Sequence, residues 1–341
     1  MKVDRRTFLK IAGAGAASLA LAACGGTTTE EAVEEEPAAE PVAVRTSALK
    51  GPTAMGLVKF MSDAEAGELE DNDYTFQIVA SPDEVTPLVA KGEVDIAAVP
   101  ANLASVLYNK TEAGVRVIAI NTLGVLYICE LGDSIQSVAD LKGKTIYASG
   151  KGSTPEYGLQ YVLEKNGLVV GEDVQIEWKS EHAECVQALA AASGEAVAML
   201  PQPFVTTAQA QNDKIRVALD LTEEWDRVQT GDEKSTMITG VAIVRAEFAD
   251  ENPAAVDAFL EHYAASVDFV NDDVEAAAEL VGEYDIVPAQ VAQKAIPECN
   301  IVCVTGADMA EQLSGYLEVL ADQNPEAVGG ALPGDDFYYG A

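Results

Sequence analysis

Short apolar runs alternate with amphipathic stretches between Val42 and Ile120. The apolar runs predict β-strands at 42–49, 74–79, 95–99 and 115–120. The stretches between them place apolar residues at helical spacing, and Ser81 followed by Pro82 is typical of a helix start with the serine as N-cap. Because short strands separated by helices pair in parallel, the pattern predicts an α/β layer fold.

The same order of elements recurs further along the chain. Apolar runs predict strands at 145–149, 174–178, 196–201 and 215–217, with helical spacing at 156–164 and again from Val186. The segment Ile215-Arg216-Val217 repeats Val115-Arg116-Val117, and the turn around Gly152 repeats the turn around Gly51. Short apolar strands can resemble one another by chance, but here strand, turn and spacing repeat together. The sequence therefore predicts two similar α/β units in tandem.

The C-terminal part of the chain has a different pattern. One more strand is predicted at 238–244, and the residues after it are mostly helical in their spacing. We expect helices at 253–270, 274–284, 288–296 and 308–323, followed by an extended end at 332–341.

The turns after the predicted strands carry proline and small or polar residues, which leave backbone N–H groups approachable by a ligand. The first of them, Lys50–Leu57, joins an apolar strand to an apolar helix. Each turn alone is also consistent with ordinary helix capping, whereas six such turns on facing edges of two units would form a cleft. The candidate ligand-binding residues are Pro52, Thr53, Ala54, Met55, Ser81, Pro100, Asn102, Gly152, Ser153, Thr154, His182 and Gln202.

The N-terminus has the features of an export signal. Arg5-Arg6 precedes an uncharged stretch that is too short to span a membrane, so residues 1–23 resemble a twin-arginine signal peptide. Leu21-Ala22-Ala23-Cys24 resembles a lipobox, which implies lipid attachment at Cys24. Residues 24–41 are rich in Glu, Pro and Ala and predict an acidic disordered tether. We therefore expect a lipid-anchored protein on the extracytoplasmic face of the cell membrane.

Composition excludes some classes of function. The formal net charge is -35, with Asp+Glu 56 against Lys+Arg 21, which argues against binding to nucleic acid or to anionic lipid. The sequence has no G-x-S-x-G elbow, no Walker A loop and no histidine at metal-ligand spacing from a cysteine. We expect no catalytic residue, no cofactor and no metal site.

Four cysteines lie outside the lipobox, and export would permit disulfides between them. Cys299 and Cys303 are the nearest pair in the sequence. The apolar surroundings of Cys129 and Cys303 instead favour buried free thiols, which is our prediction for this set.

Together these motifs resemble the solute-binding lipoproteins of ABC importers, of the nitrate, sulfonate and taurine type that includes thiamine-precursor binders. The resemblance rests on the leader and lipobox, on Gly51-Pro52-Thr53-Ala54, and on segments 94–102, 137–146 and 200–203. It implies a two-lobed type II periplasmic-binding-protein fold, with a mostly parallel sheet in each lobe. Lobe one would comprise 42–123 and 240–341, lobe two 124–239, with hinge crossings near 124–128 and 237–240.

The resemblance implies a monomer that binds a small solute and passes it to a membrane permease and its ATPase. Two ligand classes stay open. Helix N-termini with Lys50, Lys151 and Lys179 favour a sulfonate or carboxylate, although the candidate turns contain no arginine. Stacking on Tyr127, Tyr157 or Trp178 would suit a flat ring such as a pyrimidine. An enzyme of the same fold, such as a menaquinone-pathway enzyme, is the alternative function.

Overall fold

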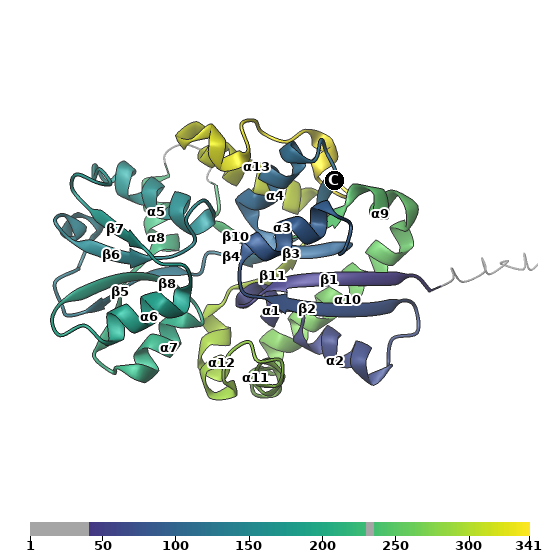
Figure 1. Cartoon of the computed structure of the whole chain (residues 1–341), viewed down its shortest axis with the longest axis horizontal. Helices are drawn as coiled ribbons and strands as arrows, with labels where there is room; N and C mark the ends of the chain where they lie inside the picture. Colours follow the sequence, from purple (N-terminus) through teal and green to yellow (C-terminus); the bar gives the residue numbers. More distant parts are fainter. Residues whose placement is uncertain (1–40, 230–234) are drawn as a thin grey trace, which may run out of the picture. The chain divides into compact units, whose positions relative to one another are not determined.

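The computed structural model describes residues 41–229 and 235–341, which carry two β-sheets with helices packed against them (Figure 1). The predictions of the signal peptide and of lipid attachment at Cys24 lie outside the described residues, as does nearly all of the predicted tether. None of the described helices is long and apolar enough to cross a membrane.

The larger sheet has six strands in the order β11-β4-β10-β3-β1-β2. Strand β1 is parallel to β2 and β3, whereas β10 is antiparallel to β3 and β4, and β11 is antiparallel to β4. The strands are β1 (Ala43–Leu49), β2 (Asp73–Val79), β3 (Ile96–Pro100), β4 (Val115–Leu123), β10 (Ile238–Arg245) and β11 (Ile301–Val304).

The second sheet has five strands in the order β7-β6-β8-β5-β9. Strand β6 is parallel to β7 and β8, and β5 is antiparallel to β8 and β9. The strands are β5 (Leu126–Leu131), β6 (Thr145–Ala148), β7 (Gln175–Trp178), β8 (Ala196–Pro201) and β9 (Ile215–Asp220). The order equals β2-β1-β3-β10-β4 of the larger sheet, with β5 in the place of β10. The prediction of two similar α/β units is thus confirmed.

Helices connect and cover the strands of both sheets. The α-helices are α1 (Pro52–Met55), α2 (Val58–Ala66), α3 (Pro82–Ala90), α4 (Ala101–Lys110), α5 (Thr154–Lys165), α6 (His182–Ala190), α7 (Phe204–Gln211), α8 (Leu221–Val228), α9 (Ala246–Glu251), α10 (Pro253–Asp272), α11 (Val274–Glu283), α12 (Ala289–Ala295) and α13 (Gly306–Gln323). The 3-10 helices are η1 (Val138–Leu141), η2 (Ile296–Glu298), η3 (Pro325–Val328) and η4 (Asp335–Phe337). Ser81 caps α3 through a capping box with Glu84, as its sequence predicts.

Some elements differ from the sequence pattern. Part of the predicted crossing at 124–128 is β5, a strand that is buried on both faces up to its last residue and therefore shows no alternation of exposed and buried positions. Helix α8 was not predicted; Asp220 caps it by accepting hydrogen bonds from the N–H groups of Thr222 and Glu223. The predicted extended end contains η4, and beyond it Tyr339 donates its backbone N–H to Val117 O at 2.9 Å.

One buried apolar cluster continues from helices of the larger sheet into helices of the second. The ring centroids of Trp225 in α8 and Tyr316 in α13 lie 5.4 Å apart, and those of Tyr161 in α5 and Trp225 lie 4.3 Å apart. Asn102 at the start of α4 adds a polar bridge, because it donates to Ala327 O at 3.0 Å and accepts from Thr154 Oγ1 at 3.3 Å. We call these five side chains (Asn102, Thr154, Tyr161, Trp225 and Tyr316) the seam.

The four cysteines of the folded part are free thiols, as predicted. Cys299 Sγ lies 4.0 Å from Met55 Sδ and does not pair with Cys303. Burial raises the pKa of the Cys129 thiol to about 12, so this group stays protonated and unreactive at neutral pH.

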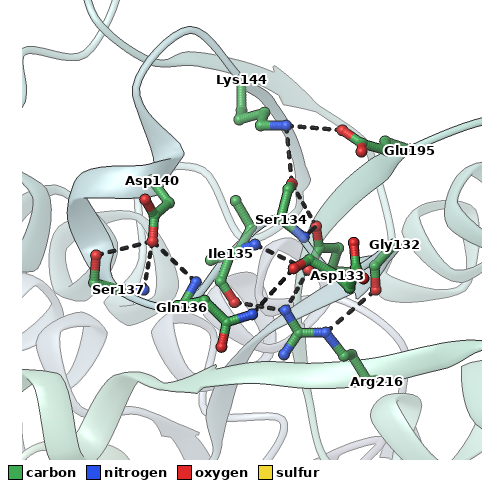
Figure 2. A network of polar contacts seen from close by, with 11 residues as sticks. Gly132, Asp133, Ser134, Ile135, Gln136, Ser137, Asp140, Lys144, Glu195 and Arg216 are labelled. Carbon is green, nitrogen blue, oxygen red and sulfur yellow. Dashed lines mark hydrogen bonds and ion pairs between the residues drawn. The ribbon is translucent and has the colours of Figure 1, made fainter.

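A buried ion pair organises the end of β5 in the second sheet. The Glu130 carboxylate accepts hydrogen bonds from the Ser134 N–H and hydroxyl, from the Ile135 N–H and from Arg216, whose Nη2 lies 2.6 Å away. Figure 2 shows Arg216 reaching back to the carbonyl of Gly132 in the same loop. This network fixes the loop between β5 and η1.

Candidate functional site

A cavity of about 540 Å³ is lined by turns of both sheets. The larger sheet contributes 49–53, 80–82 and Pro100, and the second sheet contributes turns at 149–155, 180–183 and 201–207. Residues 125–126 and Thr239, beside the two chain crossings, also line it, as does the loop between α11 and α12. A molecule in this cavity would contact both sheets at once.

The turn at Lys50–Leu57 forms one wall of the cavity. Lys50, Gly51, Pro52 and Thr53 line it, and Thr53 donates its hydroxyl to Leu49 O at 2.7 Å. Gly51 has φ 139, a conformation that favours glycine. Ala54 and Met55 are fully buried behind this wall and are not among the lining residues.

The corresponding turn of the second sheet forms the opposing wall. Ser149, Gly150 and Ser153 line the cavity, whereas the predicted Gly152 and Thr154 do not. Gly150 has φ 81, and a Cβ there would lie 2.9 Å from Pro155 Cγ. The close turn is therefore built around this glycine.

Two further predicted residues, His182 and Gln202, line the cavity. The His182 Nδ1 atom lies 2.5 Å from Ser149 Oγ, and the imidazole ring centroid is 5.0 Å from that of Phe204. Desolvation lowers the pKa of His182 to about 4, so the ring is neutral at physiological pH. Gln202 Oε1 accepts a hydrogen bond from Thr206 Oγ1 at 3.0 Å.

Ser81 and Pro100 also line the cavity, but Asn102 lies in the seam and not on the cavity wall. Phe204 lines the cavity without having been predicted, although its position next to Pro203 at the start of a helix marks the same type of turn. None of the aromatic residues expected to stack on a ligand is among the lining residues, namely Tyr127, Tyr157 and Trp178.

Three helix N-termini at the cavity already have a carboxylate of their own. Glu84 Oε1 accepts from the Ser81 N–H at 3.1 Å on α3, and Glu156 Oε2 accepts from the Gly152 N–H at 2.5 Å on α5. On α6, Glu184 Oε2 accepts from the Ser180 N–H at 3.0 Å. These carboxylates offset the positive helix ends, which reduces their attraction for an anion.

The charged residues that line the cavity are Lys50, Glu181 and Asp285, and all three are exposed. Lys151 and Lys179 are not among the lining residues. Lys179 instead bonds Glu177 at 2.6 Å, and its Nζ lies 5.2 Å from the centroid of the Tyr147 ring. No arginine is among the lining residues that the structure describes. The described residues also contain no group of three or more His, Cys, Asp or Glu that could hold a metal ion.

Comparison with protein families gives a match over residues 67–282 to a model described as "ABC transporter, phosphonate, periplasmic substrate-binding protein". Comparison with curated proteins gives no match.

Solved structures resemble the chain over most of its length. An ABC transporter protein from Parabacteroides distasonis is 24% identical over 87% of this chain and 98% of that chain, with a TM-score of 0.69. The alkanesulfonate-binding protein SsuA from Xanthomonas axonopodis pv. citri, solved bound to MOPS, is 17% identical over 87% and 96%, with a TM-score of 0.66. A Candida albicans protein described as having the generic periplasmic binding protein fold is 15% identical over 86% and 92%, with a TM-score of 0.57. These likenesses confirm the predicted fold class.

Proposed function

The chain belongs to the family of periplasmic substrate-binding proteins of phosphonate ABC transporters, and on that premise we propose that it captures a small organic solute in the 540 Å³ cavity. Proteins of this family deliver their ligand to a membrane permease and its ATPase. The observation that carries the proposal is the lining of the cavity by turns of both sheets. A ligand that contacts both sheets favours the arrangement in which the two lobes are closed around it.

We propose that the solute has a flat, apolar body and no net negative charge. Phe204 and the neutral ring of His182 supply an aromatic surface, and Leu49, Val125 and Ile286 add apolar wall. Glu181 and Asp285 outnumber Lys50 among the charged lining residues, and the three helix N-termini are capped by glutamates. Each of these features disfavours an anion and tolerates a neutral or cationic ring.

A sulfonate, phosphonate or carboxylate is the second candidate. The family description names phosphonate, and a structural neighbour is an alkanesulfonate-binding protein. Lys50 and the Ser81 hydroxyl line the cavity and could donate hydrogen bonds to such a group, whereas the Ser153 hydroxyl already donates to Gly150 O at 2.9 Å.

We also propose the lobes, anchor and oligomeric state that the sequence predicts. The strands of the six-stranded sheet support a first lobe of 42–123 and 240–341, and those of the five-stranded sheet support a second lobe of 124–239. The lipobox supports lipid attachment at Cys24 on the extracytoplasmic face, and we propose that the protein acts as a monomer without catalytic turnover. Exchange of Cys24→Ala should move the protein from the membrane fraction to the soluble fraction; an unchanged membrane fraction would remove the anchor from this proposal.

The ligand class is tested by native mass spectrometry of the purified protein followed by a thermal-shift panel. The panel pairs rings of one shape and different charge: benzylamine against benzenesulfonate, and an aminopyrimidine against a pyrimidine carboxylate. A ligand present at 100 times its Kd stabilises the folded state by about 2.7 kcal/mol, which raises the melting temperature. Selective stabilisation by the neutral or cationic members is expected. Stabilisation by the anions alone would favour the second candidate, and turnover of any bound compound would favour an enzyme.

A further inference from the structure

A second, much smaller cavity of about 10 Å³ lies between the larger sheet and helix α10. Its polar lining comes from Thr46 on β1, Asn121 on β4 and Tyr263 on α10, and its apolar lining includes Ile96 and Phe259. Thr53 lines both this cavity and the large one. The small cavity therefore lies directly behind the wall that α1 forms.

The polar groups at this cavity are buried and have no protein partner. Thr46, Asn121 and Tyr263 are each at most 2% exposed. Among the residues that the structure describes, the Thr46 hydroxyl, both amide atoms of Asn121 and the Tyr263 hydroxyl make no hydrogen bond. Buried polar groups in folded proteins nearly always have a partner, so four unpaired atoms around one cavity require an explanation.

Two glycines make the room for these groups. A Cβ at Gly240 on β10 would lie 2.5 Å from Asn121 Oδ1, and a Cβ at Gly56 would lie 3.0 Å from the Tyr263 hydroxyl. The Asn121 and Tyr263 side chains thus lie against the backbone of β10 and of the turn that follows α1.

We infer that this cavity holds one structural water molecule, which bridges Asn121 and Tyr263. The volume is that of about one water, and a buried water needs two to four polar partners. The cavity offers both kinds of partner, since the Asn121 Nδ2 group donates, its Oδ1 accepts, and the hydroxyls do either. The lining contains no carboxylate, which disfavours a buried cation.

The position of this water gives it a role in the large cavity. It ties β4 to α10 beneath Thr53, and Asn121 is also the group against which Gly240 packs at the second chain crossing. Loss of the water would free the wall formed by α1 to shift. Asn121 and Tyr263 are positioning residues for that wall. The inference does not depend on which solute the large cavity binds.

A high-resolution crystal structure of the purified protein tests the inference directly. We expect a single density peak within hydrogen-bond distance of Asn121 and of the Tyr263 hydroxyl. A cavity without density would overturn the inference, and so would a peak with contacts and electron count that fit a metal cation.

The sign of a stability change provides a second test in solution. If water pairs the Tyr263 hydroxyl, Tyr263→Phe removes a bond and lowers the melting temperature; if the hydroxyl is unpaired, the same exchange relieves it and raises the melting temperature. Thr122→Val is the matched control, because the Thr122 hydroxyl is also buried and unpaired among the described residues but does not line the cavity. We expect Tyr263→Phe to melt lower and Thr122→Val to melt no lower than the parent. A rise for Tyr263→Phe would refute the bridge.

Discussion

The exchange Glu130→Gln tests how much the buried ion pair of the second sheet contributes to stability. The Glu130 side chain is fully buried, and its Oε2 accepts from the Ile135 N–H at 3.2 Å and from Arg216 Nη2 at 2.6 Å. Glutamine keeps the shape of the side chain, but its Nε2 group would face these two donors in place of an acceptor oxygen. Both hydrogen bonds would be lost, and both are charge-assisted because their acceptor is a carboxylate.

The expected cost follows from these two bonds. A hydrogen bond to a charged group contributes roughly 1.5–3 kcal/mol, so the loss of two such bonds should cost at least about 3 kcal/mol. Arg216 is one-third exposed and still bonds the carbonyls of Gly132 and Ile135, so its own charge is not left stranded. Urea denaturation should show this loss in the free energy of unfolding, with a fall in melting temperature of roughly 5–10 °C.

A matched control lies in the same network (Figure 2). Glu195 accepts from Lys144 Nζ at 3.0 Å but is 59% exposed, so Glu195→Gln should cost less than about 1 kcal/mol. If Glu130→Gln costs no more than Glu195→Gln, the reasoning about the buried pair is wrong.

The stability difference should also depend on pH. Burial raises the pKa of the Glu130 carboxyl, but hydrogen bonds from Ser134 and Ile135 and the charge of Arg216 outweigh this effect and hold the pKa below its ordinary value. A group whose pKa is depressed on folding stabilises the protein above its unfolded pKa, about 4.3 for glutamate, and loses that contribution as the pH falls. The gap between parent and Glu130→Gln should therefore be full at pH 6–7 and narrow below about pH 4.

Three further predictions concern the seam, a crossing and the cavity. Asn102→Ala should lower the free energy of unfolding by about 1–3 kcal/mol and increase the radius of gyration measured by small-angle scattering, because the seam loses its polar bridge. Asn109→Ala is the control, since it loses bonds only to Val328 O and Ala331 O and should leave that radius unchanged. Gly124→Ala should lower the free energy of unfolding by more than about 1 kcal/mol in urea denaturation, because the new Cβ would lie 2.0 Å from Thr222 Oγ1. Gly315→Ala is the control: Gly315 lies within α13 and a Cβ there would meet no atom within 4 Å, so this exchange should be neutral or stabilising. Ligand affinity should be constant from pH 5.5 to 8 in titration calorimetry, since the pKa of His182 is lowered to about 4; a step near pH 6.5 would show that the ring titrates normally.

The parallel part of the fold was predictable because it rests on local patterns. Ser81 and Pro82 mark the start of α3, and the apolar run at 74–79 closely matches β2. Strand β5 is buried on both faces except at its last residue, and even its charged Glu130 is buried, so no alternation of polar and apolar positions distinguishes it from a linker or a helix. Strand β11 is only four residues long, and its identity depends on pairing with β4, which is remote in sequence. Such long-range pairing has no signal in a single sequence.

The turns that the sequence singled out lie at the cavity, whereas only some of the predicted side chains line it. Pro52 and Thr53 lie on the cavity wall, but the adjacent Ala54 and Met55 point into the core, because one helical turn directs its side chains to opposite sides. The sequence contains both Gly152 and Glu156, but it could not show that the Glu156 carboxylate accepts the Gly152 N–H at the N-terminus of α5. Helix N-termini predict an anion site only if no carboxylate of the chain takes that position first.

The seam limits how the two sheets can move apart. Trp225 and Tyr316 are fully buried at 0% exposure, so a motion that separated α8 from α13 would expose both rings. Burial of a large apolar side chain contributes roughly 1.5–3 kcal/mol, so an open state that exposed both rings would cost roughly 3–6 kcal/mol and would be scarcely populated. If the two lobes open as proposed, we expect them to pivot about the seam, with the larger displacement on the side where α7 meets α12 and where Thr207 and Pro288 line the cavity. The Asn102→Ala experiment tests this step, because a pivot weakened at the seam should open further than one that is intact.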